Sequence, residues 1–364
     1  MNSINVTEPF LPPLEEYIDY LKGIWDRNVL TNQGPLVREL EQSIQAYHLV
    51  DMPVHCVTNG GLGLQIMLKA LGVKGEVITT PFSYVATASC PLWEGCSVKF
   101  ADIEPDYLTI DPVAVEAAIG PDTVAILATH VFGNPCDCEA LEAIASKHGL
   151  ALIFDAAHAF GVRYKDKSIL EYGDASMVSL HATKLLHAVE GGFVAAKDPA
   201  VAEKVEWMRR FGHNGSEEFH GVGINAKMSE LHGAMGLCNL KYVQDILEKR
   251  KAVCLTYDQY FSSMAAGGLR PFAYRQESSQ NYAYYPVTYN SESSLLQAVA
   301  RLNEANIFPR RYFYPSLSSC FGDEHEGCPL AMDISRRILC LPLSSEMQQQ
   351  DVKLVAETLL KGSQ

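Results

Sequence analysis

Residues 179–192 read Ser-Leu-His-Ala-Thr-Lys-Leu-Leu-His-Ala-Val-Glu-Gly-Gly. An apolar, strand-like run (residues 175–180) leads into this stretch, and a second one (residues 193–196) follows the two glycines. We therefore expect Lys184 in a tight connection between two buried strands, where an isolated ammonium group is costly. A lysine escapes that cost when it forms an imine with an aldehyde cofactor. A surface lysine in a β-hairpin is the alternative.

Strand-like and helix-like runs alternate before this stretch. We expect strands at residues 54–58, 76–80, 97–101, 123–129 and 151–154, and helices at residues 14–25, 36–47, 113–119 and 139–148, with another that ends near residue 71. Strands separated by helices of this length predict parallel βαβ units, and hence an α/β fold with a mostly parallel central sheet and helices on both faces. Ligands of such sheets bind beyond the carboxyl ends of the strands.

The second half of the chain changes its pattern. A helix at residues 199–211 precedes a glycine-rich loop at residues 212–223 and a long helical region at residues 228–258. Strands at residues 282–289 and 337–341 then alternate with helices at residues 294–305 and 348–360. We therefore predict a large α/β domain over residues 1–250, including the N-terminal helices, and a smaller α+β domain over residues 251–364.

Composition narrows the class of protein. The 364 residues are 48% hydrophobic and carry a formal charge of −14, which argues against nucleic acid or an anionic membrane as partner. The ten cysteines lack the spacing of a zinc site, so no metal is expected and the thiols are interpreted as reduced. Without a signal-like start or an apolar run of about 18 residues, the expected location is the cytoplasm.

Asp155 and His158 follow the expected strand at residues 151–154, at the ligand-binding edge. A buried carboxylate needs a cation or donors to stay ionised, and a protonated pyridine nitrogen is such a cation. That ion pair would make the pyridine a stronger electron sink. A loop-capping Asp and a core His bonded to backbone are the alternatives.

A glycine turn opens the helix that follows the first strand. Gly60 and Gly61 leave backbone N–H groups free at a helix start, which suits a phosphate, although a purely structural turn has the same sequence. Tyr84 lies in the segment after the next strand and can lay its ring on a flat heterocycle, or simply pack in the core. Together with Lys184 and Asp155, these features indicate an aldehyde-bearing, phosphorylated pyridine.

An ordered set of motifs resembles the DegT/DnrJ/StrS family of sugar-nucleotide aminotransferases, which are pyridoxal-phosphate enzymes of fold type I. The motifs are Asp155-Ala-Ala-His158…Gly161, Gly173-Asp174-Ala-Ser, Ser179-x-x-x-x-Lys184, Glu190-Gly-Gly, Gly223-Ile-Asn225…Met228-x-Glu230 and Arg337-Ile-Leu-Cys-Leu-Pro342. With the regions around Pro9, residues 81–87 and residues 130–133, the resemblance covers nearly the whole chain.

The resemblance implies roles around the cofactor ring. Lys184 would form the Schiff base, and Asp155 would pair with the pyridine nitrogen. His158, where many relatives have Gln, would lie near the ring and its 3-oxygen, and Tyr84 would stack on the ring.

The resemblance also implies a phosphate site and a second subunit. Backbone at Gly60 and Gly61 with the Ser179 hydroxyl would hold the phosphate, and Asn225 would reach it from the neighbouring chain of a homodimer. Three departures stand out: Gly61 replaces a common Thr or Ser, Ile224 a usual aromatic residue, and Lys227 a usual Arg. None of these departures alters the Lys184–Asp155 pair.

By resemblance, the reaction is a ping-pong transamination through an internal aldimine at Lys184, with L-glutamate as donor. The form of residues 179–192 is most similar to enzymes that aminate C4 of dTDP-4-keto-6-deoxy-D-glucose, which yields a dTDP-4-amino-4,6-dideoxyglucose for deoxysugar or polysaccharide biosynthesis. Relatives acting on C3 of a dTDP-3-keto-6-deoxy sugar more often carry Tyr-Pro-Thr-Lys. Other fold-type-I chemistry, such as a desulfurase or an α-oxoamine synthase, and a non-catalytic regulator that binds the cofactor remain alternatives.

Two further segments are candidates for substrate contacts. Arg310, Arg311 and Tyr314 can supply cationic and aromatic contacts to a nucleoside diphosphate, or form a solvated surface turn. His213, in the glycine-rich loop, is a candidate neighbour of the sugar.

Overall fold

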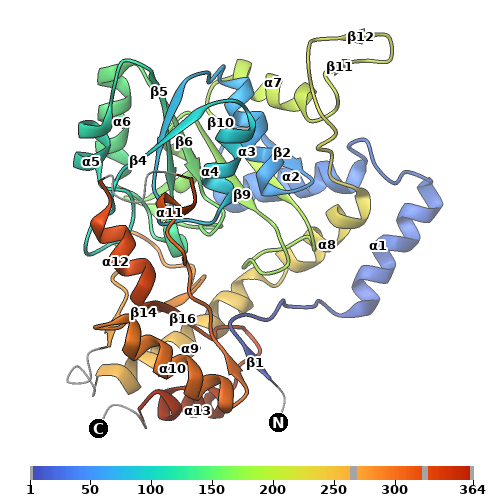
Figure 1. Ribbon diagram of the computed structural model, residues 1–364. Helices are drawn as coiled ribbons and strands as arrows, with labels where there is room; N and C mark the ends of the chain where they lie inside the picture. Colours follow the sequence, from blue (N-terminus) through green and yellow to red (C-terminus); the bar gives the residue numbers. More distant parts are fainter. Residues whose placement is uncertain (1–2, 263–268, 322–326, 361–364) are drawn as a thin grey trace.

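A seven-stranded sheet forms the centre of the larger part of the molecule (Figure 1). Its order is β2 (Val54–Val57), β10 (Gly192–Ala196), β9 (Ala175–Ser179), β6 (Ala151–Asp155), β5 (Thr123–Thr129), β3 (Glu76–Thr79) and β4 (Ser97–Phe100). The last five run parallel to one another, whereas β10 runs antiparallel to both of its neighbours. The mostly parallel sheet predicted from the sequence is confirmed. The computed structural model describes residues 3–262, 269–321 and 327–360.

Each face of this sheet has its own core. In β5, Ala125 and Leu127 are buried with residues of α3 and α7, whereas Ile126 and Ala128 are buried with residues of α2, α6 and α8. Successive side chains of a strand point to opposite faces, so a sheet covered on both sides needs an almost unbroken apolar strand. The helices of this part are α1 (Leu14–Arg27), α2 (Pro35–His48), α3 (Gly60–Ala70), α4 (Ala86–Trp93), α5 (Pro112–Ala118), α6 (Cys138–His148), α7 (Pro199–Met208), α8 (Glu230–Leu240) and α9 (Val243–Ser262).

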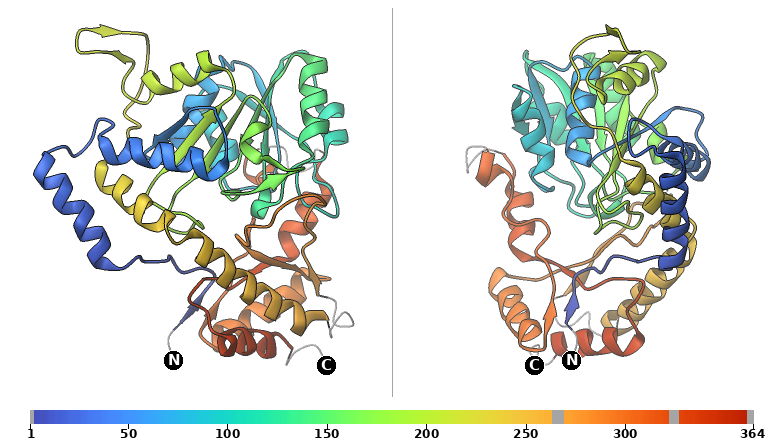
Figure 2. Two further views of the ribbon diagram at one scale, coloured as in Figure 1. Left: turned by 180° about the vertical axis from the view of Figure 1, so that it is seen from behind. Right: turned by 90° about the vertical axis from the view of Figure 1, so that its right-hand side faces the viewer.

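A smaller lobe, called here the small lobe, surrounds a three-stranded antiparallel sheet. The sheet contains β13 (Arg270–Pro271), β14 (Tyr285–Thr288) and β16 (Ile338–Leu341), and the helices are α10 (Glu292–Glu304), α11 (Ser318–Phe321), α12 (Pro329–Arg337) and α13 (Gln349–Leu360). Strand β1 (Ile4–Asn5) pairs with β15 (Ile307–Phe308), so the chain starts in this lobe, and β1 and α13 lie at the same end of the molecule (Figures 1 and 2). The predicted boundary at residue 250 falls inside α9.

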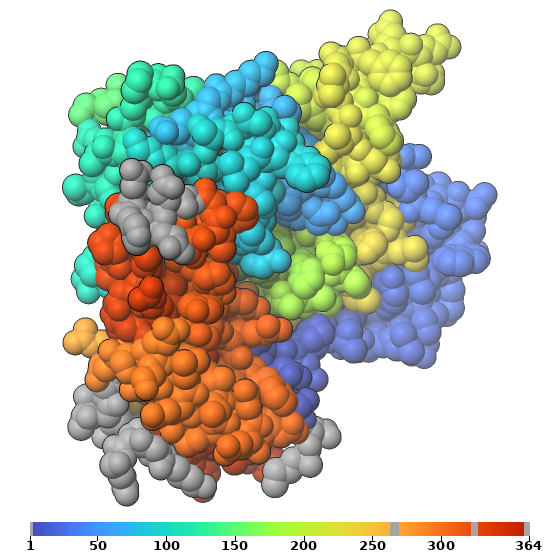
Figure 3. Space-filling view, in the orientation of Figure 1, coloured from blue at the N-terminus to red at the C-terminus, as the bar shows by residue number. Residues whose placement is uncertain are grey.

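Several predicted elements differ in detail. The helical region predicted at residues 228–258 is two helices, α8 and α9, and the helix predicted to reach residue 211 ends at Met208, before Phe211 turns to a φ of 62°. The glycine-rich loop carries a hairpin of β11 (His213–Asn214) and β12 (Glu218–Phe219), which stands away from the body (Figures 1 and 3). The remaining short elements are β7 (Arg163–Tyr164), β8 (Lys167–Ser168), η1 (Val131–Gly133) and η2 (Ile169–Glu171).

Within the described ranges, no helix is both long enough and apolar enough to cross a lipid bilayer.

Candidate active site

A pocket of about 490 Å³ opens where parallel strands of the large sheet end. Thr129, Asp155 and Ser179, the last residues of β5, β6 and β9, line it. This is the edge at which open α/β sheets bind their ligands. Seven predicted site residues line the pocket together: Gly60, Gly61, Tyr84, Asp155, His158, Ser179 and Lys184. A larger surface groove of about 980 Å³, beside α9 and α13, contains none of them.

Lys184 extends into the pocket from the connection between β9 and β10. The predicted tight connection, residues 180–191, is a folded loop of twelve residues: Ala188 N donates to Leu180 O at 2.8 Å and Lys184 N to His181 O at 2.8 Å. The Lys184 Nζ lies 3.4 Å from Tyr284 Oη. Burial lowers the pKa of this amine, against the opposing charge of Asp155. A larger share of the amine is therefore unprotonated and nucleophilic than in an exposed lysine.

Asp155 ends β6 and is 4% exposed. Its carboxylate accepts hydrogen bonds from Thr87 Oγ1 at 2.8 Å and from Ala157 N at 3.1 Å. Burial nevertheless raises the pKa of Asp155, against these two donors and the charge of Lys184. A carboxylate in that environment is stabilised by a further cation inside the pocket.

His158 is buried among aromatic rings. Its ring lies 4.8 Å from that of Tyr284 and runs almost parallel to that of Phe313, at 5.8 Å between centroids. Phe132 N donates to His158 Nδ1 at 3.2 Å. Burial, with a smaller contribution from Lys184, holds the pKa of His158 well below its usual value. The imidazole is therefore neutral at physiological pH.

The start of α3 forms one wall of the pocket. Asn59 caps this helix by accepting from Leu62 N at 2.9 Å, which leaves the first N–H groups, at Gly60 and Gly61, available to a ligand. Glycine fits closely at position 192, because a Cβ there would lie only 3.0 Å from Gly60 N. The Ser179 hydroxyl stands on the same wall and accepts from His181 N at 3.3 Å. This wall is suited to a phosphate group.

Five predicted site residues do not line this pocket: His213, Asn225, Arg310, Arg311 and Tyr314. His213 belongs to the projecting hairpin, and Asn225 is exposed and accepts from Lys227 Nζ at 2.6 Å. The Arg311 guanidinium lies over the Tyr314 ring at 3.6 Å and pairs with Glu292 at 2.6 Å, while Arg310 is exposed. From the same segment as the two arginines, Tyr312 and Phe313 line the pocket instead.

Residues 14–360 match the DegT/DnrJ/EryC1/StrS aminotransferase family. The chain belongs to this family. A dTDP-4-amino-4,6-dideoxy-D-glucose transaminase of Shigella dysenteriae is 38% identical over 362 residues, 98% of each chain, and one of the same name from Escherichia coli is 34% identical over 372 residues, again 98% of each. Among solved structures, DesI in the presence of its TDP-sugar product superposes with a TM-score of 0.93 at 30% identity, covering 99% of this chain and 92% of DesI. The predicted family and fold type I are thereby confirmed.

Sequence reasoning missed several residues of this family member that line the pocket or, like Thr87, hold a lining residue from behind. Thr87 holds Asp155 and is itself bonded to Ser83 at 2.7 Å. It follows Tyr84 by three residues, which is one helical turn, and that spacing is the signal that would have found it. Tyr284 and Tyr312 come from the small lobe, where no local pattern marks a residue as facing Lys184.

Proposed function

We propose that this aminotransferase-family chain binds pyridoxal 5'-phosphate in the pocket and moves an amino group from L-glutamate to C4 of a nucleotide-linked 4-keto-6-deoxy sugar, dTDP-4-keto-6-deoxy-D-glucose. The observation that carries the proposal is that one pocket contains both a half-buried amine, Lys184, and a buried carboxylate, Asp155. The names of the Shigella and Escherichia relatives support C4 of a dTDP-linked sugar as the acceptor.

The residues present fit the cofactor. Burial raises the pKa of Asp155 despite the charge of Lys184, and a protonated pyridine nitrogen would supply a further cation. The N–H groups at Gly60 and Gly61 suit the phosphate, and Tyr84, 59% exposed at the pocket wall, offers a ring face. A volume of about 490 Å³ is within the usual range for a small-molecule or cofactor pocket.

The protein's own groups then move the proton. Pyridoxal phosphate, when bound, supplies an aldehyde that condenses with an amine and a ring that accepts the electrons of a carbanion. With the cofactor held by these residues, the Lys184 amine would move the proton, as base at the donor carbon and then as acid. Asp155 keeps the ring nitrogen protonated, and the Tyr284 hydroxyl, 3.4 Å from the amine, orients it.

The test is to locate the covalent bond. Borohydride reduction of the holoenzyme followed by peptide mapping is expected to place the cofactor on Lys184. Lys184→Ala should lower turnover at least about a thousand-fold, since proton transfer by a positioned side chain alone contributes roughly 10²–10⁴-fold. Lys197→Ala is the control, because Lys197 pairs with Glu142 on the surface. Cofactor found on another lysine, or unchanged turnover without Lys184, contradicts the proposal.

The acceptor needs its own assay. Product mass from dTDP-4-keto-6-deoxy and dTDP-3-keto-6-deoxy sugars, each with glutamate, decides between C4 and C3. Conversion of only the 3-keto sugar would establish the C3 reaction instead. A cofactor that accepts no nitrogen from glutamate, together with a shifted DNA fragment in a gel, would favour the non-catalytic regulator.

We also propose that the active site is completed in a homodimer. Residues 211–225, called here the arm, project from the body (Figure 3) and expose Phe211, Phe219 and Val222 at 49%, 65% and 89%. Apolar side chains exposed to this degree on a projecting segment are typical of a subunit interface. Asn225 ends the arm and lies outside its own chain's pocket, so it is suited to the pocket of a second copy.

A further inference from the structure

A strap from the small lobe lies against two loops of the active site. The strap, residues 273–281, includes Asn281, whose Nδ2 donates to His158 O at 2.8 Å and to Phe160 O at 3.1 Å. It also includes Arg275, which contacts the turn of residues 130–136. Both loops start at the ends of sheet strands, β6 and β5. The strap therefore connects the small lobe to the two loops that follow β5 and β6 at the edge of the pocket.

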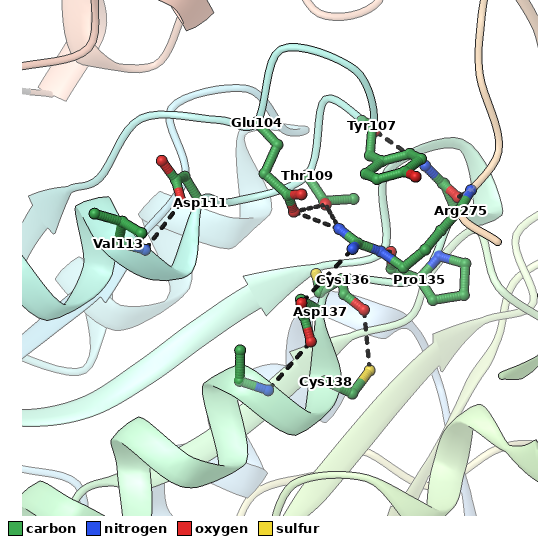
Figure 4. A network of polar contacts seen from close by, with 12 residues as sticks. Glu104, Tyr107, Thr109, Asp111, Val113, Pro135, Cys136, Asp137, Cys138 and Arg275 are labelled. Atoms are coloured by element: carbon green, nitrogen blue, oxygen red, sulfur yellow. Dashed lines mark hydrogen bonds and ion pairs between the residues drawn. The ribbon is translucent and has the colours of Figure 1, made fainter. Parts of the chain in front are cut away.

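Arg275 is 8% exposed, and its donors are shared among several acceptors. Its Nε donates to Pro135 O at 2.9 Å, and its backbone N donates to Asn134 Oδ1 at 2.8 Å. The guanidinium also donates to Glu104 and lies 4.3 Å from the ring centroid of Tyr107. Figure 4 shows the side chain reaching between the loop that carries Glu104 and Thr109 and the turn that carries Pro135 to Asp137.

The turn that Arg275 holds contacts two predicted cofactor residues, Asp155 at the end of β6 and His158 in the loop that follows it. His130 N donates to Asp155 O at 3.0 Å, and Phe132 N donates to His158 Nδ1 at 3.2 Å. Phe132 makes this bond with a φ of 58° and a ψ of 15°, a left-handed conformation that is strained for a bulky residue. Such strain persists only where surrounding contacts over-determine the backbone. Arg275 supplies two such contacts: its side chain bonds to Pro135, and its backbone N bonds to Asn134.

The bond from Phe132 decides the tautomer of His158. A backbone N–H can only donate, so His158 Nδ1 is an acceptor and the ring proton lies on Nε2. In the described part of the chain no residue accepts from Nε2, and His158 lines the pocket. Its Nε2–H is therefore a donor available to a ligand in the pocket.

We propose that Arg275 is a positioning residue of the active site. By holding the turn of residues 130–136, it keeps Phe132 N on His158 Nδ1 and so presents His158 Nε2–H as a fixed donor to the oxygen of the cofactor ring. The part that concerns the cofactor rests on the proposed function. The part that concerns the His158 tautomer does not.

The site requires an arginine, because different parts of one guanidinium contact Pro135, Glu104 and Tyr107 simultaneously. The planar guanidinium donates through Nε in one direction and through its terminal nitrogens in another, while its face lies over the Tyr107 ring. A lysine keeps the charge against Glu104 but has a single donor group and no planar face. Arg275→Lys is therefore expected to fold and yet to hold the turn less firmly.

The primary experiment reads the tautomer of His158. Two-bond ¹H–¹⁵N spectra of histidine-labelled full-length holoenzyme, assigned by His158→Gln, should show the Nε2–H form in the wild type. Arg275→Met and Arg275→Lys should lower its share or broaden its signals, with the larger change in Arg275→Met. Arg337→Met is the matched control, because Arg337 pairs with Asp333 and donates to Tyr289 O within the small lobe. Arg337→Met should leave the His158 signals unchanged.

The cofactor gives a second readout. The pH midpoint of the bound cofactor's absorbance should move by about half a unit to one unit in Arg275→Met, the size expected for loss of one hydrogen bond. Asp155, Tyr84 and Tyr312 act on the pKa of Lys184 and are unaltered in these variants. The kcat should fall about tenfold with little change in KM for the donor.

Three outcomes separate the two proposals. A folded Arg275→Lys or Arg275→Met variant with wild-type His158 signals overturns the positioning role. If Arg275→Met does not fold, Arg275→Lys alone decides. If the wild type carries no cofactor on Lys184 but the His158 signals respond to Arg275, the proposed function is wrong and the positioning role stands.

Discussion

Gly61 lies at the start of α3, in the wall of the pocket proposed to hold the phosphate. A Cβ at Gly61 would meet only Asn59 Oδ1 at 3.4 Å and Cys90 Sγ at 3.9 Å, which are ordinary contacts, so the backbone does not require a glycine. By contrast, a Cβ at Gly60 would lie 2.9 Å from Met177 Sδ. A side chain is therefore crowded at position 60, whereas position 61 has space for one.

This difference predicts a gain of function. Gly61→Ser should bind pyridoxal phosphate about five- to tenfold more tightly, because a hydroxyl there adds one hydrogen bond to a charged group. Gly61→Ala is the matched control, since it fits the same space without a hydroxyl and should leave the affinity near that of the wild type. Titration of the cofactor-free variants with the cofactor measures this, and equal affinity for Ser and Ala would contradict the assignment of the phosphate to this wall.

Asp155 predicts how stability without the cofactor depends on pH. Because burial raises its pKa in the folded protein, the folded state binds a proton that the unfolded state has already lost. Its contribution to stability is complete below the unfolded pKa and is lost as the pH rises through the folded pKa. Asp155→Asn should remove this loss, so the cofactor-free variant should lose less unfolding free energy than the wild type between about pH 4 and about pH 7. Parallel pH slopes in denaturant unfolding would show that Asp155 is not the cause.

At the scale of elements, a side chain of α8 caps the N-terminus of α2. Glu230, fully buried in the first turn of α8, accepts from Leu36 N at 3.0 Å and from Val37 N at 2.9 Å, two of the free N–H groups at the start of α2. The N-cap of α2 is Gly34, which has no side chain to cap the helix and whose Cβ would overlap the Glu230 carboxyl. Within its motif, Glu230 itself is thus explained by helix packing rather than by the pocket.

Removing this carboxylate should destabilise the protein. Glu230→Ala leaves two buried N–H groups without an acceptor, and a loss of about 3 kcal/mol is expected from roughly 1–3 kcal/mol for each. Glu15→Ala, on the exposed first turn of α1, should change stability by less than about 0.5 kcal/mol. Denaturant unfolding followed by circular dichroism compares the two, and a similar small loss in both would rule out the capping role.

At the scale of the whole molecule, the arm predicts that subunits share their sites. A heterodimer of one Lys184→Ala chain and one Asn225→Ala chain should contain one complete site, with Lys184 from one chain and Asn225 from the other. Purified through two different tags, it should reach about half of the wild-type turnover per dimer. If Asn225 instead served its own chain, mixing would restore nothing, and the heterodimer would be no more active than the average of its parents.

The sequence by itself determined the succession of strands and helices along the large α/β part of the chain and the sheet edge at which the pocket lies. Strand runs such as residues 123–129 are apolar throughout, and Asp155 and Ser179 end strands, so their meeting at one edge follows from parallel pairing alone. The family and the fold type followed from motifs that stand in a fixed order along the chain.

Only the tertiary structure decided what faces those residues. Tyr284 lies beside Lys184, and Asn281 and Arg275 hold the loops around His158, although these residues are far apart in the sequence. Asn225 does not line the pocket of its own chain. Hydrophobic periodicity reports which face of an element is buried, but it contains nothing about which distant segment covers that face. Contacts between the lobes are therefore decided by packing and not by any local pattern.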